Sequence, residues 1–139
     1  MRLSLRRAVR PWAPAAAMMA LLFLASSIPG SSVGLQSGYD LAAHALAYGL
    51  LGVLVLHALA GGRWRGITGR RAAGAVIIAG LYGLSDELHQ RFVPGRTATL
   101  LDLAADVGGA LCGVLLLWAC GIVLSIRRQG PGERREFDG

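Results

Sequence analysis

The chain has 139 residues, of which 54% are hydrophobic and 16% are charged, and its formal net charge is +6. A chain this apolar is not intrinsically disordered, because disorder requires low hydrophobicity. Its apolar share also exceeds the value of about 45–50% that is usual in soluble domains. All 14 basic residues are arginine, but no stacking-aromatic pattern or groove-binding motif accompanies them. We therefore expect a membrane protein without a nucleic-acid partner.

Four apolar segments are long enough, or nearly so, to cross a bilayer, whose hydrocarbon core needs about 20 helical residues. They cover residues 12–28, 41–60, 72–90 and 103–126. The third is the weakest, because its last part carries Ser85, Asp86, Glu87, His89 and Gln90. For any single segment, a buried helix of a soluble protein is the alternative. We predict an all-α fold, a four-transmembrane-helix bundle over residues 1–126, followed by a cytoplasmic tail over residues 127–139.

The arginines predict how the helices are oriented. Twelve of the 14 precede the first segment, lie between the second and third, or follow the fourth, while Arg91 and Arg96 lie on the other side. Arginine is enriched in cytoplasmic loops, so we expect both termini in the cytoplasm of a multi-pass protein of the bacterial plasma membrane. The net charge then divides into +9 inside and −3 outside. Cleavage of the first segment as a signal peptide is the alternative, and it would leave three helices.

Polar side chains recur at helical spacing near the extracytoplasmic end of the three later segments. The three sets are Asp40, His44 and Tyr48; Tyr82, Asp86 and Gln90; and Asp102, Asp106, Gly109 and Gly113. Residues four apart share one helix face, and ionisable groups that face lipid are costly. We therefore expect these faces to point inward and to form an acidic, histidine-containing pocket open to the outer leaflet. A polar clamp that only holds the helices together is the alternative.

Small residues and a turn complete the expected bundle. Pairs at a spacing of four, namely Ala45 and Gly49, Ala79 and Gly83, and Gly109 and Gly113, predict close helix contacts. The Pro-Gly pair before Arg96 suits a tight reversal, which would fold Arg96 back over the acids. Arginine is suited to bidentate capture of a phosphate or carboxylate.

The candidate ligand-binding residues are therefore Asp40, His44, Tyr48, Asp86, Glu87, Gln90, Arg96, Asp102 and Asp106. We expect no cofactor and no metal site. Asp86, Glu87, His89 and Asp106 are able to act as ligands, but they follow no known ligand spacing.

Two blocks of sequence carry a family resemblance. The first is Asp40-Leu41-Ala42-Ala43-His44, followed by Tyr48 and Leu51-Gly52, and the second runs from Ser85 to Arg96, followed by Asp102, Asp106 and Gly109. Together they resemble the VanZ-like family of small bacterial membrane proteins over roughly residues 21–113. Ser26-Ser27-Ile28-Pro29 is similar to the family too, which argues against cleavage. Lys is common in the family at the position of Leu41, and Asn at that of Asp106, so no role of those side chains is carried over.

The resemblance implies a task in the outer leaflet or cell wall, since the family's founding member is associated with resistance to a lipoglycopeptide antibiotic. The first hypothesis is an envelope protein that binds a lipid headgroup, a wall precursor or a lipoglycopeptide. The alternative is a membrane-embedded acid/base enzyme acting on a lipid-linked phosphate or ester. In that enzyme Asp86 or Glu87 would be the general base, His44 or His89 the proton shuttle, and Arg96 the oxyanion partner. The sequence leaves the choice and the oligomeric state open.

Overall fold

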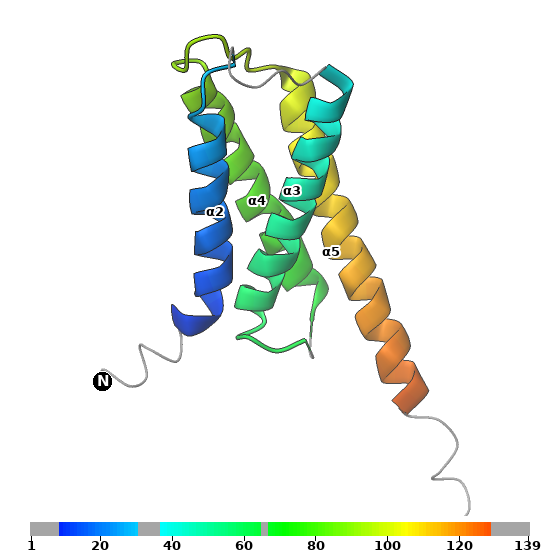
Figure 1. Ribbon diagram of the computed structural model, residues 1–139. Coiled ribbons are helices and arrows are strands. Elements are labelled where there is room, and N and C mark those ends of the chain that lie inside the picture. Colours follow the sequence, from blue (N-terminus) through cyan, green and yellow to red (C-terminus); the bar gives the residue numbers. More distant parts are fainter. Residues whose placement is uncertain (1–8, 31–36, 65–66, 129–139) are drawn as a thin grey trace, which may run out of the picture.

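The computed structural model describes residues 9–30, 37–64 and 67–128, with only the backbone described for residues 37–40 and 122–128. A short 3-10 helix, η1 (Arg10–Trp12), leads into α2 (Ala13–Ser26), which is followed by α3 (Ser37–Leu59), α4 (Gly69–Gln90) and α5 (Leu100–Arg128). The four α-helices run alternately up and down in one bundle (Figure 1). The described part of the chain is thus all-helical, as predicted.

The helix bounds differ from the prediction mainly at the ends. The first helix is shorter than predicted and ends at Ser26, where the hydroxyls of Ser26 and Ser27 both donate to the Phe23 carbonyl. The last helix begins at Leu100 and extends to Arg128, into the predicted tail. Its start is set by Thr99, whose hydroxyl accepts from the Asp102 backbone N–H at 3.2 Å, a common N-cap contact. Residues 129–139 lie outside the described residues.

The close contact between α3 and α5 depends on small residues at their interface. A Cβ atom on Gly109 would lie 2.0 Å from the Ala45 carbonyl oxygen, and one on Gly113 would lie 2.5 Å from that of Gly49. The predicted small-residue pairs on these two helices therefore do lie at a helix–helix contact. Small residues permit such backbone approach. Below this contact, α3 and α4 bury a core that includes Leu51, Val55, Leu56, Ala75 and Ala79.

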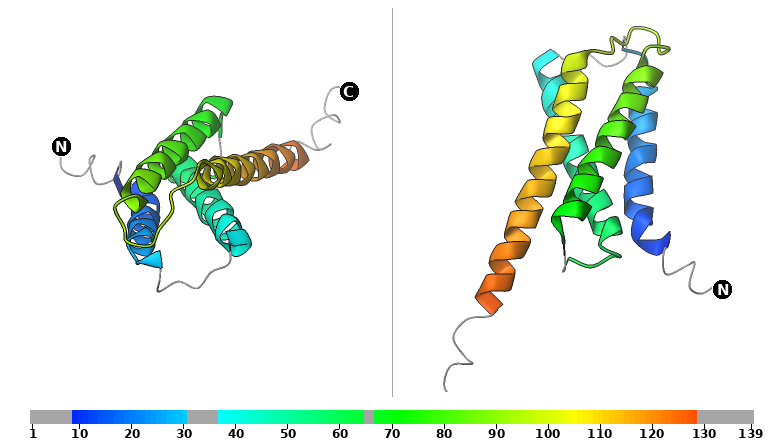
Figure 2. Two further views of the ribbon diagram at one scale, coloured as in Figure 1. Left: turned by 90° about the horizontal axis from the view of Figure 1, so that it is seen from above. Right: turned by 180° about the vertical axis from the view of Figure 1, so that it is seen from behind.

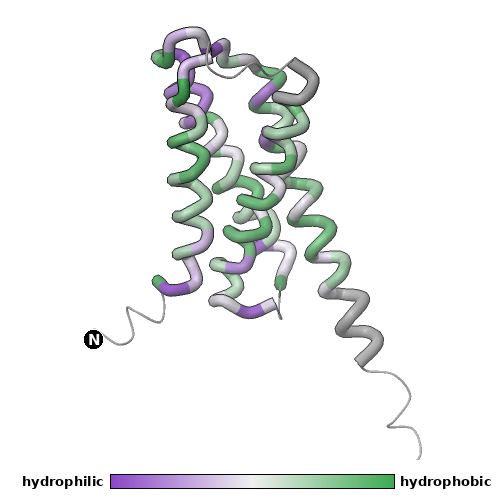
Figure 3. The backbone as a smooth tube through the Cα atoms, viewed as in Figure 1, coloured by the Kyte–Doolittle hydropathy of each residue, from purple (hydrophilic) through white to green (hydrophobic). Residues whose placement is uncertain are grey.

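Large apolar side chains cover the outside of the bundle as well as filling its centre. Leu21 on α2, Leu46 on α3, Leu81 on α4 and Leu116 on α5 are all more than 60% exposed. The middle of the bundle is accordingly hydrophobic, and hydrophilic residues gather towards its two ends (Figure 3). A soluble protein rarely exposes contiguous apolar surface on this scale.

Two helical stretches, Leu41–Leu59 and Leu100–Gly121, are long and apolar enough to cross a membrane. Most of each stretch lies on the surface of the bundle, with 39% and 28% of the two windows buried, which is unlike the core helix of a soluble protein. By the same test α2 is too short with 14 residues, and α4 carries charged residues near both of its ends. Length and composition therefore weakly support a membrane protein and do not by themselves establish four spans.

Candidate functional site

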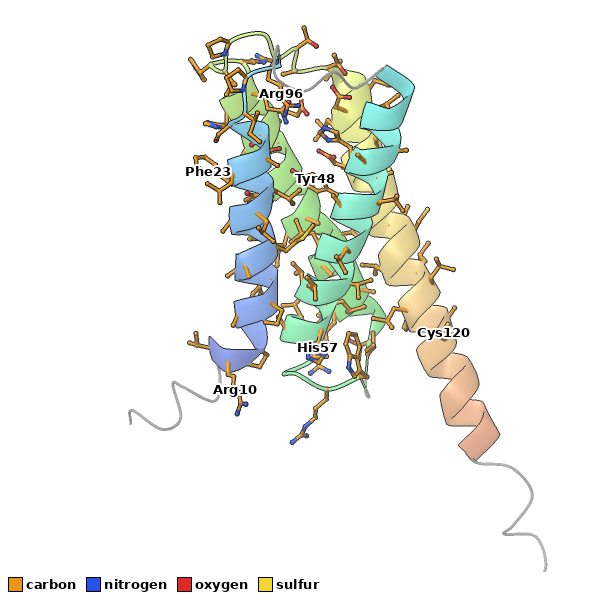
Figure 4. All side chains as sticks on the ribbon, viewed as in Figure 1. Arg10, Phe23, Tyr48, His57, Arg96 and Cys120 are labelled. Carbon is orange, nitrogen blue, oxygen red and sulfur yellow. The ribbon has the colours of Figure 1, made fainter. Side chains whose placement is uncertain are left out.

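A pocket of about 260 Å³ lies between α2, α3 and α4, near the end of the bundle that holds Arg96. Figure 4 shows Arg96 at this end and Arg10 and His57 at the opposite end, with Tyr48 between them. The last turns of α4 lie beside α2 here, whereas the first turns of α3 lie apart from α2 (Figures 1 and 2). The pocket is lined by Leu22, Ala25, Ser26, Ile28, Ala43, His44, Ala47, Tyr48, Asp86, Gln90 and Arg96.

On the α3 side, the pocket is bounded by a histidine that a buried acid orients. His44 Nδ1 lies 2.8 Å from Asp106 Oδ1 on α5, and the Asp106 side chain is fully buried. The His44 ring is parallel to that of Tyr48 one turn further along, with the ring centres 6.3 Å apart. The predicted faces of α3 and α5 therefore do point towards each other. A carboxylate bound to one imidazole nitrogen fixes the orientation of the ring, so His44 presents a defined edge to the pocket.

On the α4 side, the polar face is turned inward and the leucines are turned outward. Asp86, Glu87 and Gln90 are each at most 5% exposed, while Leu84 and Leu88 are exposed by 46% and 49%. Gln90 Nε2 donates to Asp86 Oδ2 at 3.1 Å. Three of the five polar residues that made this segment the weakest predicted span thus lie on the inner face of its helix, whereas Ser85 is exposed and His89 is half-buried.

Several polar atoms near the pocket make no hydrogen bond within the described part of the chain. They are the hydroxyl oxygen of Tyr48, Asp86 Oδ1, both carboxylate oxygens of Glu87, and Asp106 Oδ2. Leaving a buried polar group unpaired costs about 1–3 kcal/mol, and more when the group is charged. Such a concentration of unpaired acceptors is typical of a site that takes a ligand or an ion.

Arg96 lines the pocket together with Asp86, but its hydrogen bonds go to α2. Its Nε donates to the Ile28 carbonyl at 3.1 Å and its second terminal nitrogen to the Ala25 carbonyl at 3.0 Å. Ala25 is in the last turn of α2 and Ile28 follows the end of this helix, where the helix dipole favours a cation. Arg96 therefore holds the end of α2 against the loop before α5, in addition to bounding the pocket.

A second contact fixes the same loop. The backbone N–H of Gly30 donates to the Pro94 carbonyl at 3.1 Å. A Cβ on Gly30 would lie 1.8 Å from the Gly95 carbonyl oxygen, and Gly95 itself has a φ of +73°, which favours glycine. The predicted Pro94-Gly95 reversal is thus held by direct backbone contact with the segment after α2.

Four other polar residues considered from the sequence are not part of the pocket lining, namely Asp102, His89, Tyr82 and Arg91. Asp102 accepts a hydrogen bond from Thr99 at 2.7 Å, and His89 Nε2 lies 3.0 Å from the Ser27 hydroxyl. Tyr82 donates to the Met19 carbonyl, and Arg91 is exposed after the end of α4. The side chain of Asp40 lies outside the described residues. His89 and Tyr82 thus join α4 to α2 instead of bounding the pocket.

Sequence reasoning missed the contribution of the first helix. Leu22, Ala25, Ser26 and Ile28 form one wall of the pocket, although the predicted polar faces lay only on the later helices. The sole sequence signal was the Ser26-Ser27-Ile28-Pro29 block, which resembled the family without suggesting a site.

One group of side chains beside the pocket has the composition of a metal site. His44, Glu87 and Asp106 come from three different helices, and one potential ligand atom from each lies within 4.8 Å of the others. The set differs from the one considered from the sequence, because Asp86 is not part of it and His89 bonds to Ser27.

The fold and this site define a small helical-bundle protein with an apolar exterior and a polar pocket between its helices. A family model described as VanZ/LLP1 matches residues 12–124. This range includes α2, α3 and α4 and all of α5 except its last four residues. The chain belongs to the VanZ/LLP1 family, as the sequence resemblance predicted. No curated protein and no solved structure matches the chain significantly.

Proposed function

We propose that this protein is a multi-pass protein of the bacterial plasma membrane whose pocket binds the polar headgroup of an amphiphile from the outer leaflet. All four helices span the membrane in this proposal, with both termini in the cytoplasm. Together η1 and α2 form a helical segment of 17 residues, the lower limit of the range of about 17–25 residues for a span. The acids of α4 are buried and its leucines face outward, so lipid would meet an apolar surface on this helix as well.

Cysteine labelling tests this topology. Thr97 and Arg63 are both exposed and lie in loops at opposite ends of the bundle. Each is replaced by Cys in a chain carrying Cys112→Ser and Cys120→Ser, and intact cells are treated with a membrane-impermeant maleimide. The expected result is labelling of T97C, and labelling of R63C only after the cells are opened. Labelling of R63C in intact cells would refute the orientation.

The binding proposal rests on one observation, namely that the pocket is lined by both polar and apolar side chains. His44, Asp86, Gln90 and Arg96 supply hydrogen-bonding groups, and Leu22, Ala25, Ile28, Ala43 and Ala47 supply apolar wall. Ligand pockets are typically mostly apolar, with a few placed polar groups that orient the ligand. The volume of about 260 Å³ is close to the lower limit of about 300 Å³ for such sites. It suits a headgroup with the start of a chain, while the remaining chain lies along the outside of α2 and α3.

Filling the pocket is the direct test of binding. Ala47 lines the pocket, and the adjacent Leu46 is 76% exposed on the outer face of the same helix. Ala47→Trp should occupy the pocket, whereas Leu46→Trp adds the same ring to the lipid-facing surface. Purified wild type and variants are incubated with phosphatidylglycerol, undecaprenyl phosphate or a lipoglycopeptide, and the retained ligand is measured by native mass spectrometry. Retention of one of these probes by wild type and L46W but not by A47W is expected. Equal retention by both variants would refute the pocket as the site.

The family resemblance suggests a second test, made in cells, of a role in antibiotic resistance. A role in lipoglycopeptide resistance predicts that expression of wild type or L46W raises the inhibitory concentration of a lipid-tailed glycopeptide, and that A47W does not. A glycopeptide without the lipid tail serves as the control. An unchanged inhibitory concentration in every strain would remove the resistance role and leave the binding proposal to the retention measurement.

The His44–Asp106 pair favours an enzyme as the second candidate function. A histidine held by a carboxylate is an arrangement used for general acid/base catalysis, and here the His44 side chain also lines the pocket. Asp86 would then act beside it on a lipid-linked phosphate or ester. Asp86→Asn separates the two functions, because an enzyme would keep ligand binding and lose turnover. Absence of turnover by the wild type on each retained probe would reject the enzyme.

A further inference from the structure

The buried group formed by His44, Glu87 and Asp106 has chemistry that the proposed binding function does not use. We propose that these three side chains form a binding site for a divalent transition-metal cation, with Zn²⁺ as the best-fitting probe. The site joins α3, α4 and α5, since each helix supplies one ligand.

The first argument is the geometry of the potential ligand atoms. One ligand atom from each side chain lies within 4.8 Å of the others. Nitrogen and oxygen ligands lie about 2.0–2.2 Å from a tetrahedrally coordinated Zn²⁺, so two of them on one ion are about 3.3–3.6 Å apart. Side-chain movements of about 1 Å would therefore bring all three atoms onto one ion at their usual distances.

The second argument is the unpaired carboxylate of Glu87. This side chain is 95% buried, and neither of its oxygens has a hydrogen-bond partner in the described part of the chain. Asp106 is fully buried, and its Oδ2 is also without a partner there. Buried acids are normally paired or coordinate a metal. The free lone pairs of Glu87 and Asp106 are the acceptors that a bound cation would satisfy.

The third argument is the close packing of Asp106 against α4. A Cβ on Gly83 would lie 2.9 Å from Asp106 Oδ2 and 3.2 Å from the Tyr48 ring. Gly83 is on α4, one turn before Glu87, so the missing side chain lets Asp106 pack directly against α4, on the same side of that helix as Glu87. A larger residue at this position would press on Asp106 and displace it.

The fourth argument is electrostatic. Asp86, Glu87 and Asp106 bring three acidic groups to one part of the bundle, where His44 is the basic side chain within hydrogen-bonding distance of Asp106. Buried charges are expensive unless they are paired or coordinate a metal, and a bound divalent cation is often the largest charge in its surroundings. One imidazole and two carboxylates are a suitable ligand set for Zn²⁺, and Mn²⁺ is the natural comparison because carboxylates favour it.

Such an ion would also change the chemistry of the pocket. His44 belongs both to the proposed metal site and to the pocket lining. A cation there would add positive charge beside an otherwise acidic wall and favour a phosphate-bearing headgroup. This consequence rests on the proposed function, whereas metal binding itself does not.

Metal content tests the site on the full chain. Protein purified in detergent is stripped with EDTA, incubated with Zn²⁺ or Mn²⁺, desalted and analysed by mass spectrometry for bound metal. The expected result is one ion per chain, as for a dedicated metal site. His44→Gln, Glu87→Gln and Asp106→Asn should each weaken Zn²⁺ binding about tenfold or more, since even loss of a group that only orients a ligand costs about 10–100-fold.

Asp102→Asn is the matched control. Asp102 is another acid on α5, one turn before Asp106, and it accepts a hydrogen bond from Thr99. Its replacement removes the same charge from the same helix and should weaken Zn²⁺ binding far less than D106N does, because Asp102 is not among the three ligands. Equal weakening by D102N and D106N would show nonspecific attraction and overturn the site. Substoichiometric metal in wild type would overturn it as well.

A second measurement covers the case of a variant that folds poorly. At the same Zn²⁺ concentration, Zn²⁺ should raise the melting temperature of the wild type and of D102N more than that of E87Q, because a ligand stabilises the state that binds it in proportion to its affinity. The two proposals can fail separately. A47W should still bind Zn²⁺ while losing the amphiphile. If the wild type retains none of the amphiphiles but binds Zn²⁺, only the proposed function is refuted.

Discussion

Gly109 lies where α5 meets α3, and replacing it by Ala tests both the bundle and its connection to the site. A Cβ at this position would lie 2.0 Å from the Ala45 carbonyl oxygen, whereas Cβ contacts below 3.0 Å are essentially never seen. The two helices must therefore separate by about 1 Å. The Ala45 oxygen is backbone, so no side-chain rotation can relieve the contact.

Separating the two helices would also break the neighbouring contact between His44 and Asp106. His44 precedes Ala45 on α3, and Asp106 lies one turn before Gly109 on α5. A movement of about 1 Å would lengthen their contact from 2.8 Å to about 3.8 Å, beyond the range of a hydrogen bond. Overpacking costs about 1–3 kcal/mol, and the lost hydrogen bond costs about 1 kcal/mol. Together they predict that these contacts cost G109A about 3 kcal/mol, or roughly 100-fold in the folding equilibrium, before any gain in helix propensity is counted.

Gly108→Ala is the matched control, because a Cβ on Gly108 meets nothing within 4 Å. Both substitutions carry the same gain in helix propensity of about 1 kcal/mol, so their difference isolates the contact with α3. The assay is unfolding of the purified protein by sodium dodecyl sulfate, followed by far-ultraviolet circular dichroism. Unfolding of G109A at the same detergent fraction as G108A would refute the close approach of α3 and α5.

Three further predictions concern the ends of the helices. Thr99→Val removes the cap of α5 and should destabilise the protein by about 1 kcal/mol, whereas Thr99→Ser should keep most of that stability in the same unfolding assay. Gly30→Ala places a Cβ 1.8 Å from the Gly95 carbonyl oxygen, so limited proteolysis should cut the loop before α5 faster than in wild type; an unchanged rate would contradict the contact. Ser27→Ala removes the partner of His89 at 3.0 Å and should cost about 1 kcal/mol, a loss that Ser27→Thr is expected to avoid.

Local features of the sequence were sufficient to predict the four helices and their inner faces. The recurrence of His44 and Tyr48, or of Asp86 and Gln90, at a spacing of four places them on one side of a helix whatever the rest of the chain does. Small residues on α3 and α5 likewise predicted a close contact. The helix ends were less accurate, because Ser26 and Thr99 end and start their helices through hydrogen bonds of individual side chains.

The sequence did not predict the hydrogen-bond partners of the polar side chains. Arg96 was expected over the acids, and it bonds to the carbonyl groups at the end of α2 instead. His89 was a candidate proton shuttle, but it bonds to Ser27. Each of these contacts joins residues more than 60 positions apart, so it depends on how whole helices cross.

The amino-acid sequence by itself thus determined an apolar helical chain with polar side chains on the inner faces of three helices and most of its arginines in segments predicted to share one side. These properties follow from composition and from the helical repeat, which act over a few residues. Only the tertiary structure decided that α2 forms a wall of the pocket and that His44, Glu87 and Asp106 meet. The reason is that their distances depend on the depth, rotation and crossing of separate helices, which no local spacing specifies.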